Sequence, residues 1–158
     1  MKNTKKILFF DMDGVLVDFD SGVQKLDEET KKAYEGHIDD VPGVFALMDM
    51  KDKDDTKEAV KKLAEKYDIF ILSTAPWKNP TALNDKVEWV KRHFGDKEGT
   101  PFYKRLIFTH RKDLCHGDYL IDDRPDKCGV DKFTGEVIHF GSEKFPKWDA
   151  VLEYLMGK

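Results

Sequence analysis

The feature that most constrains the fold is a set of short, uninterrupted apolar runs, several of which end directly in acidic or hydroxyl residues. A strand with one exposed face alternates apolar and polar residues. A strand buried on both faces of a parallel sheet does not alternate, so it forms an uninterrupted apolar run. We therefore predict buried strands over residues 7–10, 69–72, 106–108, 119–121 and 137–140.

The stretches between these runs carry apolar side chains at helical spacing. Residues 54–66, 84–94 and 148–155 are predicted to form amphipathic helices, with Gly95 capping the C-terminus of the second. Strands that alternate with helices predict an α/β fold with a Rossmann-like parallel sheet flanked by helices. In such sheets, ligands bind beyond the carboxyl ends of the strands.

Composition excludes several kinds of partner. The chain has 158 residues and a formal net charge of −4, which argues against a binder of nucleic acid polymers. No stretch approaches the roughly 20 consecutive apolar residues of a membrane span, so no membrane partner is expected. The two cysteines, Cys115 and Cys128, are too few for a disulfide framework or a zinc site, and we interpret both as reduced thiols of a cytoplasmic protein.

Acidic and hydroxyl side chains lie at the predicted strand ends. Asp11 and Asp13 follow the first strand, and Ser73 and Thr74 follow the second. Asp122 and Asp123 follow the fourth. If these strands are adjacent, the side chains converge on one crevice. Clustered carboxylates repel one another unless a cation neutralises them, and oxygen ligands suit the hard ion Mg²⁺.

The same cluster indicates phosphate chemistry. A carboxylate can attack a phosphoryl group as a covalent nucleophile, and a second acid can protonate the leaving oxygen and later activate water. In extended chain, residues two apart project to the same side, which suits the pair Asp11 and Asp13. Gly14 lets the backbone turn behind the pair.

These residues carry a resemblance to a known superfamily. The segment 11–16, Asp-Met-Asp-Gly-Val-Leu, resembles the first motif of the haloacid dehalogenase-like phosphatases. The strand that ends at Ser73, the lysine at Lys112 and the paired Asp122 and Asp123 match the later motifs in the same order. The resemblance spans residues 7–125. It implies the haloacid dehalogenase-like fold and a Mg²⁺-dependent phosphomonoesterase with an aspartyl-phosphate intermediate.

A narrower resemblance connects the chain to the 5'(3')-deoxyribonucleotidases. Residues 11–19, 73–77, 89–95 and 120–125 are similar to segments of that family. The resemblance implies hydrolysis of deoxyribonucleoside monophosphates. It also implies that Phe19 occupies the position of a phenylalanine that stacks near the base.

The resemblance also implies a small helical cap inserted after the first strand. Residues 15–17 are a short β-prone piece, and residues 21–36 are polar and mostly helix-compatible. Animal members carry a longer insert, and here only residues 18–52 are available for it. We therefore predict a catalytic core of residues 1–17 and 53–158. Phe45 and Tyr34 are the candidates for further aromatic contacts from this cap.

The expected roles follow from these matches. The predicted catalytic residues are the nucleophile Asp11, the acid and base Asp13, the phosphate-binding Ser73 and the charge-balancing Lys112. The predicted metal ligands are Asp11, Asp13 through its main-chain carbonyl, Asp122 and Asp123; the sequence leaves open which of the last two binds directly. The predicted substrate contacts are Phe19, Ser73, Thr74, Trp77 and Lys112.

Three alternatives remain at this point. A small cap could admit sugar phosphates or other small phosphomonoesters. A receiver domain also combines an aspartyl-phosphate with a hydroxyl and a lysine, but it places its acidic pair on the first strand and its acceptor on a middle one. A catalytically silent binding module is disfavoured, since unneutralised carboxylates cost stability. The sequence leaves the oligomeric state open.

Overall fold

A five-stranded parallel sheet forms the centre of the molecule. The computed structural model describes residues 4–158. The strands are β1 (Ile7–Phe10), β4 (Asp68–Ser73), β5 (Leu106–Phe108), β6 (Tyr119–Asp122) and β7 (Glu136–His139), in the spatial order β5-β4-β1-β6-β7. Every pairing is parallel, with Phe10 opposite Ile71 on one side and Ile121 on the other. The five predicted strands are confirmed, and each boundary lies within one residue of its expected place.

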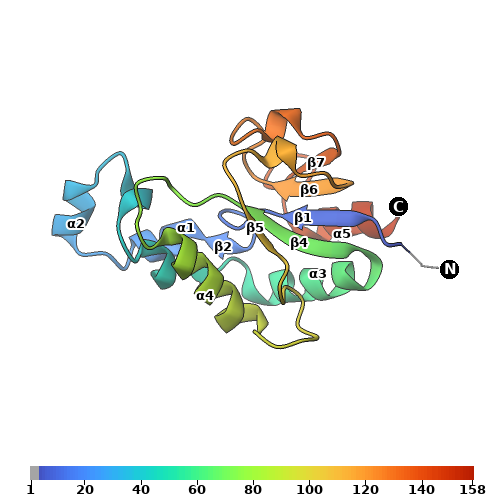
Figure 1. Ribbon diagram of the computed structural model, residues 1–158, viewed down its shortest axis with the longest axis horizontal. Coiled ribbons are helices and arrows are strands. Elements are labelled where there is room, and N and C mark those ends of the chain that lie inside the picture. The colour runs from blue at the N-terminus through green and yellow to red at the C-terminus, as the bar shows by residue number, and fades with distance from the viewer. Residues whose placement is uncertain (1–3) are drawn as a thin grey trace.

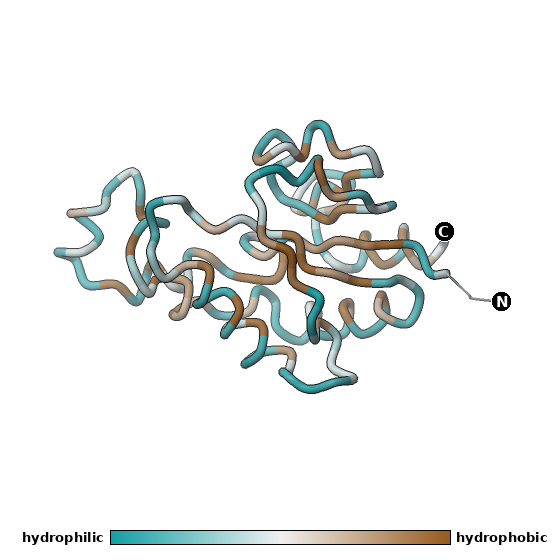
Figure 2. Tube along the Cα trace, in the orientation of Figure 1, coloured by the Kyte–Doolittle hydropathy of each residue, from teal (hydrophilic) through white to brown (hydrophobic). Residues whose placement is uncertain are grey.

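One face of the sheet is covered by helices. Leu8 and Phe10 belong to a large core cluster that includes residues of α3 (Lys53–Lys66), α4 (Ala82–Phe94) and α5 (Trp148–Met156). The predicted helices are therefore confirmed, and α4 begins two residues earlier than expected. Figure 2 shows the hydrophobic residues of the tube concentrated in the central strands.

The other face has a thinner cover. Phe9, Leu72 and Leu120 form a second cluster with Val130 and Phe133, and none of these buried residues lies in an α-helix. Short 3-10 helices lie in the segments that follow β5 and β6. These are η3 (Lys112–Leu114) and η4 (Val130–Lys132). Within residues 4–158, the buried apolar residues of α3, α4 and α5 thus belong to the first core cluster. In the second core cluster, the sheet is covered by Val130 and Phe133 from the segment after β6.

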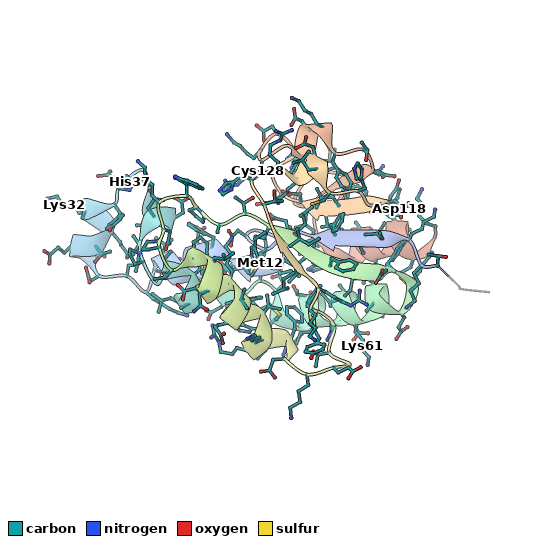
Figure 3. All side chains as sticks on the ribbon, in the orientation of Figure 1. Met12, Lys32, His37, Lys61, Asp118 and Cys128 are labelled. Carbon is teal, nitrogen blue, oxygen red and sulfur yellow. The ribbon has the colours of Figure 1, made fainter. Side chains whose placement is uncertain are left out.

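The segment between β1 and α3 extends from the carboxyl end of the sheet (Figure 1). It starts and ends at an antiparallel pair of two-residue strands, β2 (Val17–Asp18) and β3 (Asp49–Met50). Between them lie α1 (Phe19–Val23), α2 (Glu28–Ala33), η1 (Ile38–Asp40) and η2 (Val44–Leu47). Figure 3 shows Lys32 of this segment and Asp118, which precedes β6, at opposite ends of the molecule.

The helical content of this segment differs from the expectation in detail. Residues 21–36 form two short helices because two aspartates cap separate N-termini. The side chain of Asp18 accepts from Ser21 N, and that of Asp27 accepts from Thr30 N. We keep the predicted boundaries and propose that residues 18–52, which include both short helices, form the cap.

None of the helices in residues 4–158 has the length and apolar content needed to cross a bilayer.

Candidate active site

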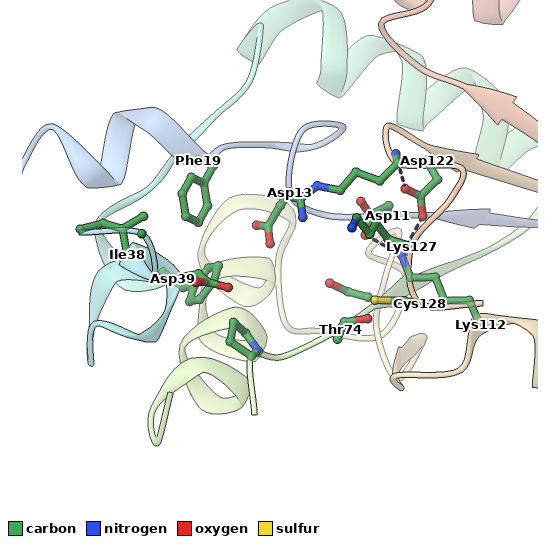
Figure 4. Close-up of a pocket in the computed structure, with 15 residues that line it drawn as sticks. Asp11, Asp13, Phe19, Ile38, Asp39, Thr74, Lys112, Asp122, Lys127 and Cys128 are labelled. Carbon is green, nitrogen blue, oxygen red and sulfur yellow. Dashed lines mark hydrogen bonds and ion pairs between the residues drawn. The ribbon is translucent and has the colours of Figure 1, made fainter. Parts of the chain in front are cut away.

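The predicted convergence of side chains is present. Asp11 directly follows β1, Ser73 ends β4 and Asp122 ends β6. These three strands are neighbours, so their carboxyl ends meet at one point. A cavity of about 440 Å³ opens there between sheet and cap (Figure 4). Its lining comprises Asp11, Asp13, Phe19, Gly36, Ile38, Asp39, Phe45, Ser73, Thr74, Pro76, Lys112, Asp122, Arg124, Lys127 and Cys128.

Lys112 joins two of the strand ends. Its Nζ donates to Asp11 Oδ1 at 2.8 Å and to Asp122 Oδ2 at 2.7 Å, and the residue is 4% exposed. Burial alone would lower the pKa of Lys112, but the charges of Asp11 and Asp122 outweigh it and raise that pKa. Lys112 therefore remains an ammonium that balances both carboxylates.

A group of three carboxylates lies beside this lysine. Oxygens of Asp11, Asp122 and Asp123 lie within 4.8 Å of one another. Burial raises the pKa of Asp11, with Lys112 opposing and Asp122 reinforcing this effect. Burial, followed by the charge of Asp11, raises the pKa of Asp123 to about 7. Oδ1 of Asp123 is buried without a hydrogen-bond partner in the described chain. The cluster therefore fits a hard divalent cation, which would supply the missing positive charge and occupy the free oxygen.

Gly14 permits the close approach of Asp123. Gly14 has a φ of +82°, and a Cβ at this position would lie 2.0 Å from Asp123 Oδ2. A side chain here would both strain the backbone and displace a carboxylate of the cluster.

The side chain of Asp13 pairs with Lys86 and not with the three-carboxylate group. Its Oδ2 accepts from Lys86 Nζ at 3.0 Å, and its Oδ1 is enclosed with no hydrogen-bond partner among residues 4–158. The three-carboxylate group does not include Asp13. Its predicted contribution to a metal site therefore remains that of the main-chain carbonyl.

The two hydroxyl residues differ in their contacts. Ser73 is 1% exposed, and its Oγ accepts from Lys86 Nζ at 3.2 Å. The Thr74 hydroxyl donates to Thr109 O at 2.7 Å, which ties the end of β4 to the segment after β5. Both residues line the cavity.

Aromatic residues of the cap line the far side of the cavity. Phe19 and Phe45 meet edge to face with their ring centroids 5.9 Å apart. Tyr34 packs on His37 outside the lining. Trp77 is 86% exposed, packs on His110 and does not belong to the cavity lining. Its expected substrate contact therefore has no support from the geometry.

Sequence reasoning missed one residue at the centre of the site. Lys86 is 2% exposed and contacts Asp13, Ser73 and the carbonyl of Thr74. A signal was present, because Lys86 lies three and four residues before the buried Trp89 and Val90 of α4. A lysine within the apolar stripe of a helix indicates a buried charge with a partner. The cavity also includes Arg124, which follows the paired Asp122 and Asp123 in the sequence.

The parallel sheet, with carboxylates and a hydroxyl at the ends of three neighbouring strands and a lysine that bridges two of them, has the arrangement expected of a phosphatase that resembles the haloacid dehalogenase-like class. Residues 28–148 match the family model described as "5' nucleotidase, deoxy (Pyrimidine), cytosolic type C protein". The chain therefore belongs to this family, and it is a phosphoric monoester hydrolase of the nucleotidase type.

Two similar proteins carry names that agree with this assignment. A protein of Vibrio phage KVP40 named "Putative 5'(3')-deoxyribonucleotidase" is 48% identical over 154 residues, which cover 98% of this chain and 86% of the relative. A Staphylococcus aureus (strain Mu50) protein of the same name is 32% identical, with 97% of each chain covered. A solved haloacid dehalogenase-like hydrolase, SP0104 from Streptococcus pneumoniae, aligns over 98% of this chain and 100% of its own, with 13% identity and a TM-score of 0.38.

Proposed function

We propose that this protein is a Mg²⁺-dependent 5'(3')-deoxyribonucleotidase that acts through an aspartyl-phosphate on Asp11. The observation that carries the proposal is the meeting of Asp11, Lys112 and Ser73 in one cavity whose opposite wall is aromatic. The names of the related phage and bacterial proteins support the substrate class.

The metal would be held by Asp11, Asp122 and Asp123 together with the main-chain carbonyl of Asp13. An all-oxygen set of this kind suits Mg²⁺. When bound, the ion neutralises the clustered carboxylates and the phosphoryl oxygens, so that an anionic nucleophile can approach an anionic substrate.

The first chemical step transfers the phosphoryl group to the enzyme. A carboxylate oxygen of Asp11 attacks phosphorus, and the bond from phosphorus to the ester oxygen breaks. Asp13 donates a proton to that leaving oxygen, which departs as the nucleoside hydroxyl. Lys112 and the Ser73 hydroxyl hold the phosphoryl oxygens in place.

The second step regenerates the enzyme. Asp13, now a carboxylate, takes a proton from a water molecule that attacks phosphorus. The bond between phosphorus and the Asp11 oxygen breaks and inorganic phosphate is released. Asp13 is protonated again and Asp11 is free, so protons and charges balance over the cycle.

The cavity suits a small phosphomonoester with an aromatic group. Its volume of about 440 Å³ lies within the usual range for ligand sites. With the phosphate at Lys112, the ring of Phe19 lies on the cap side (Figure 4). Phe19 meets Phe45 edge to face, and a base can pack against this pair. We include a cytoplasmic location in the proposal, since the free thiols of Cys115 and Cys128 suit a reducing compartment.

Phosphate release from a substrate panel tests the proposal. The panel contains dUMP, dTMP, dGMP, UMP, 3'-dUMP and several sugar phosphates, with Mg²⁺ present. We expect a clear preference for deoxyribonucleotides and loss of turnover both in Asp11→Asn and after chelation. Equal rates on sugar phosphates would overturn the substrate class but keep the mechanism. Turnover that survives Asp11→Asn would overturn the mechanism.

A further inference from the structure

Lys86 is a buried cation whose hydrogen-bonding capacity is fully used. It extends from α4, is 2% exposed, and donates to Asp13 Oδ2 at 3.0 Å, to Ser73 Oγ at 3.2 Å and to the Thr74 carbonyl at 2.6 Å. An ammonium has three protons, so each of them has a partner. Lys86 therefore has no proton left for a phosphoryl oxygen, in contrast to a lysine that binds substrate.

The cap closes over this cation. The ring centroid of Phe45, in η2, lies 4.6 Å from Lys86 Nζ, and Phe45 is itself 2% exposed. The indole of Trp89, one turn along α4, donates to the Met48 carbonyl just after η2 at 2.9 Å. Lys86 thus lies in a fixed place between the core and the cap, where a cation and an aromatic face attract each other.

This arrangement makes the two oxygens of Asp13 different. Oδ2 accepts from an ammonium, which can only donate. Oδ1 is the oxygen with no partner among the described residues. Oδ1 is therefore the atom left to exchange a proton with a leaving group or a water.

We propose that Lys86 is a positioning residue that fixes the Asp13 carboxyl with Oδ1 toward the reacting atoms. The inference rests on the proposed role of Asp13 as acid and base. It predicts that Lys86 acts on the protonation of the leaving oxygen and not on phosphate binding. If Lys86 merely balanced buried charge, its removal would slow the turnover of all substrates equally and would also lower the stability of the protein.

Leaving-group dependence separates these cases. The alkoxide leaving group of dTMP needs a proton, whereas the nitrophenolate of p-nitrophenyl phosphate departs without one. We expect Lys86→Met to slow release of thymidine from dTMP by about 100-fold in single turnover, the size of a lost general acid. The burst of nitrophenolate should change less than about 3-fold, and inhibition by inorganic phosphate should be unchanged. Equal losses on both substrates would overturn the proposal.

A double-mutant cycle with Asp13→Asn gives an independent test. If Lys86 acts through Asp13, adding Lys86→Met to Asp13→Asn should cost less than about 3-fold more with dTMP. The double variant also removes both members of the ion pair, so it remains informative if Lys86→Met alone fails to fold. A further loss of about 10-fold in that background would overturn the proposal.

Failure of the proposed function gives a different result. If Asp13→Asn slows both substrates equally, then Asp13 is not the acid, and the role of Lys86 fails together with it. If Asp13→Asn spares the nitrophenolate burst and Lys86→Met does not, only the inference about Lys86 fails.

Discussion

At the scale of single residues, two nearly buried lysines determine how the site is built. Lys86 and Lys112 are 2% and 4% exposed, and each is paired with aspartate. A buried charge without a partner is costly, so removing one member of such a pair destabilises the protein more than removing both. Lys112 balances Asp11 and Asp122, while Lys86 holds Asp13. The two candidate reacting carboxyls therefore have separate cationic partners.

A second residue-scale feature is the contact between Gly14 and Asp123. We expect Gly14→Ala to lose most activity, because its Cβ would collide with the Asp123 carboxylate and because L residues are strained at its φ of +82°. The control is Gly141→Ala, which has a φ of +87° and nothing within 4 Å of the added Cβ. Both variants should be about 1–2 kcal/mol less stable from backbone strain, as measured by urea unfolding. Comparable activity in the two variants would contradict the collision.

The sequence predicted residue identities better than side-chain directions. The meeting of Asp11, Ser73, Lys112 and Asp122 in one cavity was predictable because these residues follow strand ends or motif spacing, which are properties of the chain. The outward direction of Trp77 and the inward direction of Lys86 depend on packing against distant segments. Lys86 lies against a carboxylate 73 positions away, which no local pattern reports.

At the scale of elements, α4 connects the cap to the core. Its buried side includes Lys86 and Trp89, which contact Asp13 and the Met48 carbonyl. His93, in its last turn, stacks on Trp89 with ring centroids 4.2 Å apart. The packing around Trp89, which bonds the Met48 carbonyl, therefore includes an ionisable imidazole.

Stability should decrease at acid pH through His93. Burial lowers the pKa of His93, helped by the charges of Arg92, Lys57 and Lys53 and opposed by Asp49. The unfolded chain therefore binds the proton more readily than the folded one. This contribution to stability is present above the unfolded pKa of about 6.5 and is lost as pH falls below it.

Urea unfolding at pH 7.5 and 5.5 measures this effect. We expect the wild-type midpoint to fall more than that of His93→Gln between the two pH values. His116→Gln removes an exposed histidine and should follow the wild type. An equal pH dependence in the wild type and His93→Gln would refute the role of His93.

The strands were predictable and parts of their surroundings were not. The runs at residues 7–10 and 119–121 are buried on both sides, so hydrophobicity alone marks them. Residues 21–36 contain an N-cap at Asp27 that divides one polar stretch into two helices. The cover of the second sheet face depends on Val130 and Phe133, which lie near short 3-10 turns and have no helical periodicity.

At the scale of the whole molecule, the acidic cluster should link metal binding to stability. Asp11, Asp122 and Asp123 repel one another until a metal cation is bound. Folding brings these three residues together, so only the folded chain offers the site. We expect Mg²⁺ to raise the melting temperature relative to chelator at matched ionic strength. At a Mg²⁺ concentration 100 times the Kd, the gain is about 2.7 kcal/mol.

Asp123→Asn should reduce this shift, because Asp123 carries the unpartnered oxygen. Asp20→Asn, which changes an exposed carboxylate of α1, should retain it in full. A shift of the same size in all three proteins would mean that Mg²⁺ binds elsewhere.

The central position of β1 also affects how the enzyme is made. The ion pair between Asp11 and Lys112 joins residues 101 positions apart, and β1 pairs with β6 only after that strand exists. Contacts of such high contact order form slowly, because a long loop must close first. On the ribosome, Asp11 leaves the exit tunnel well before Lys112, Asp122 and Asp123. We therefore expect a nascent chain to show no phosphatase activity until the residues after β6 have also left the tunnel.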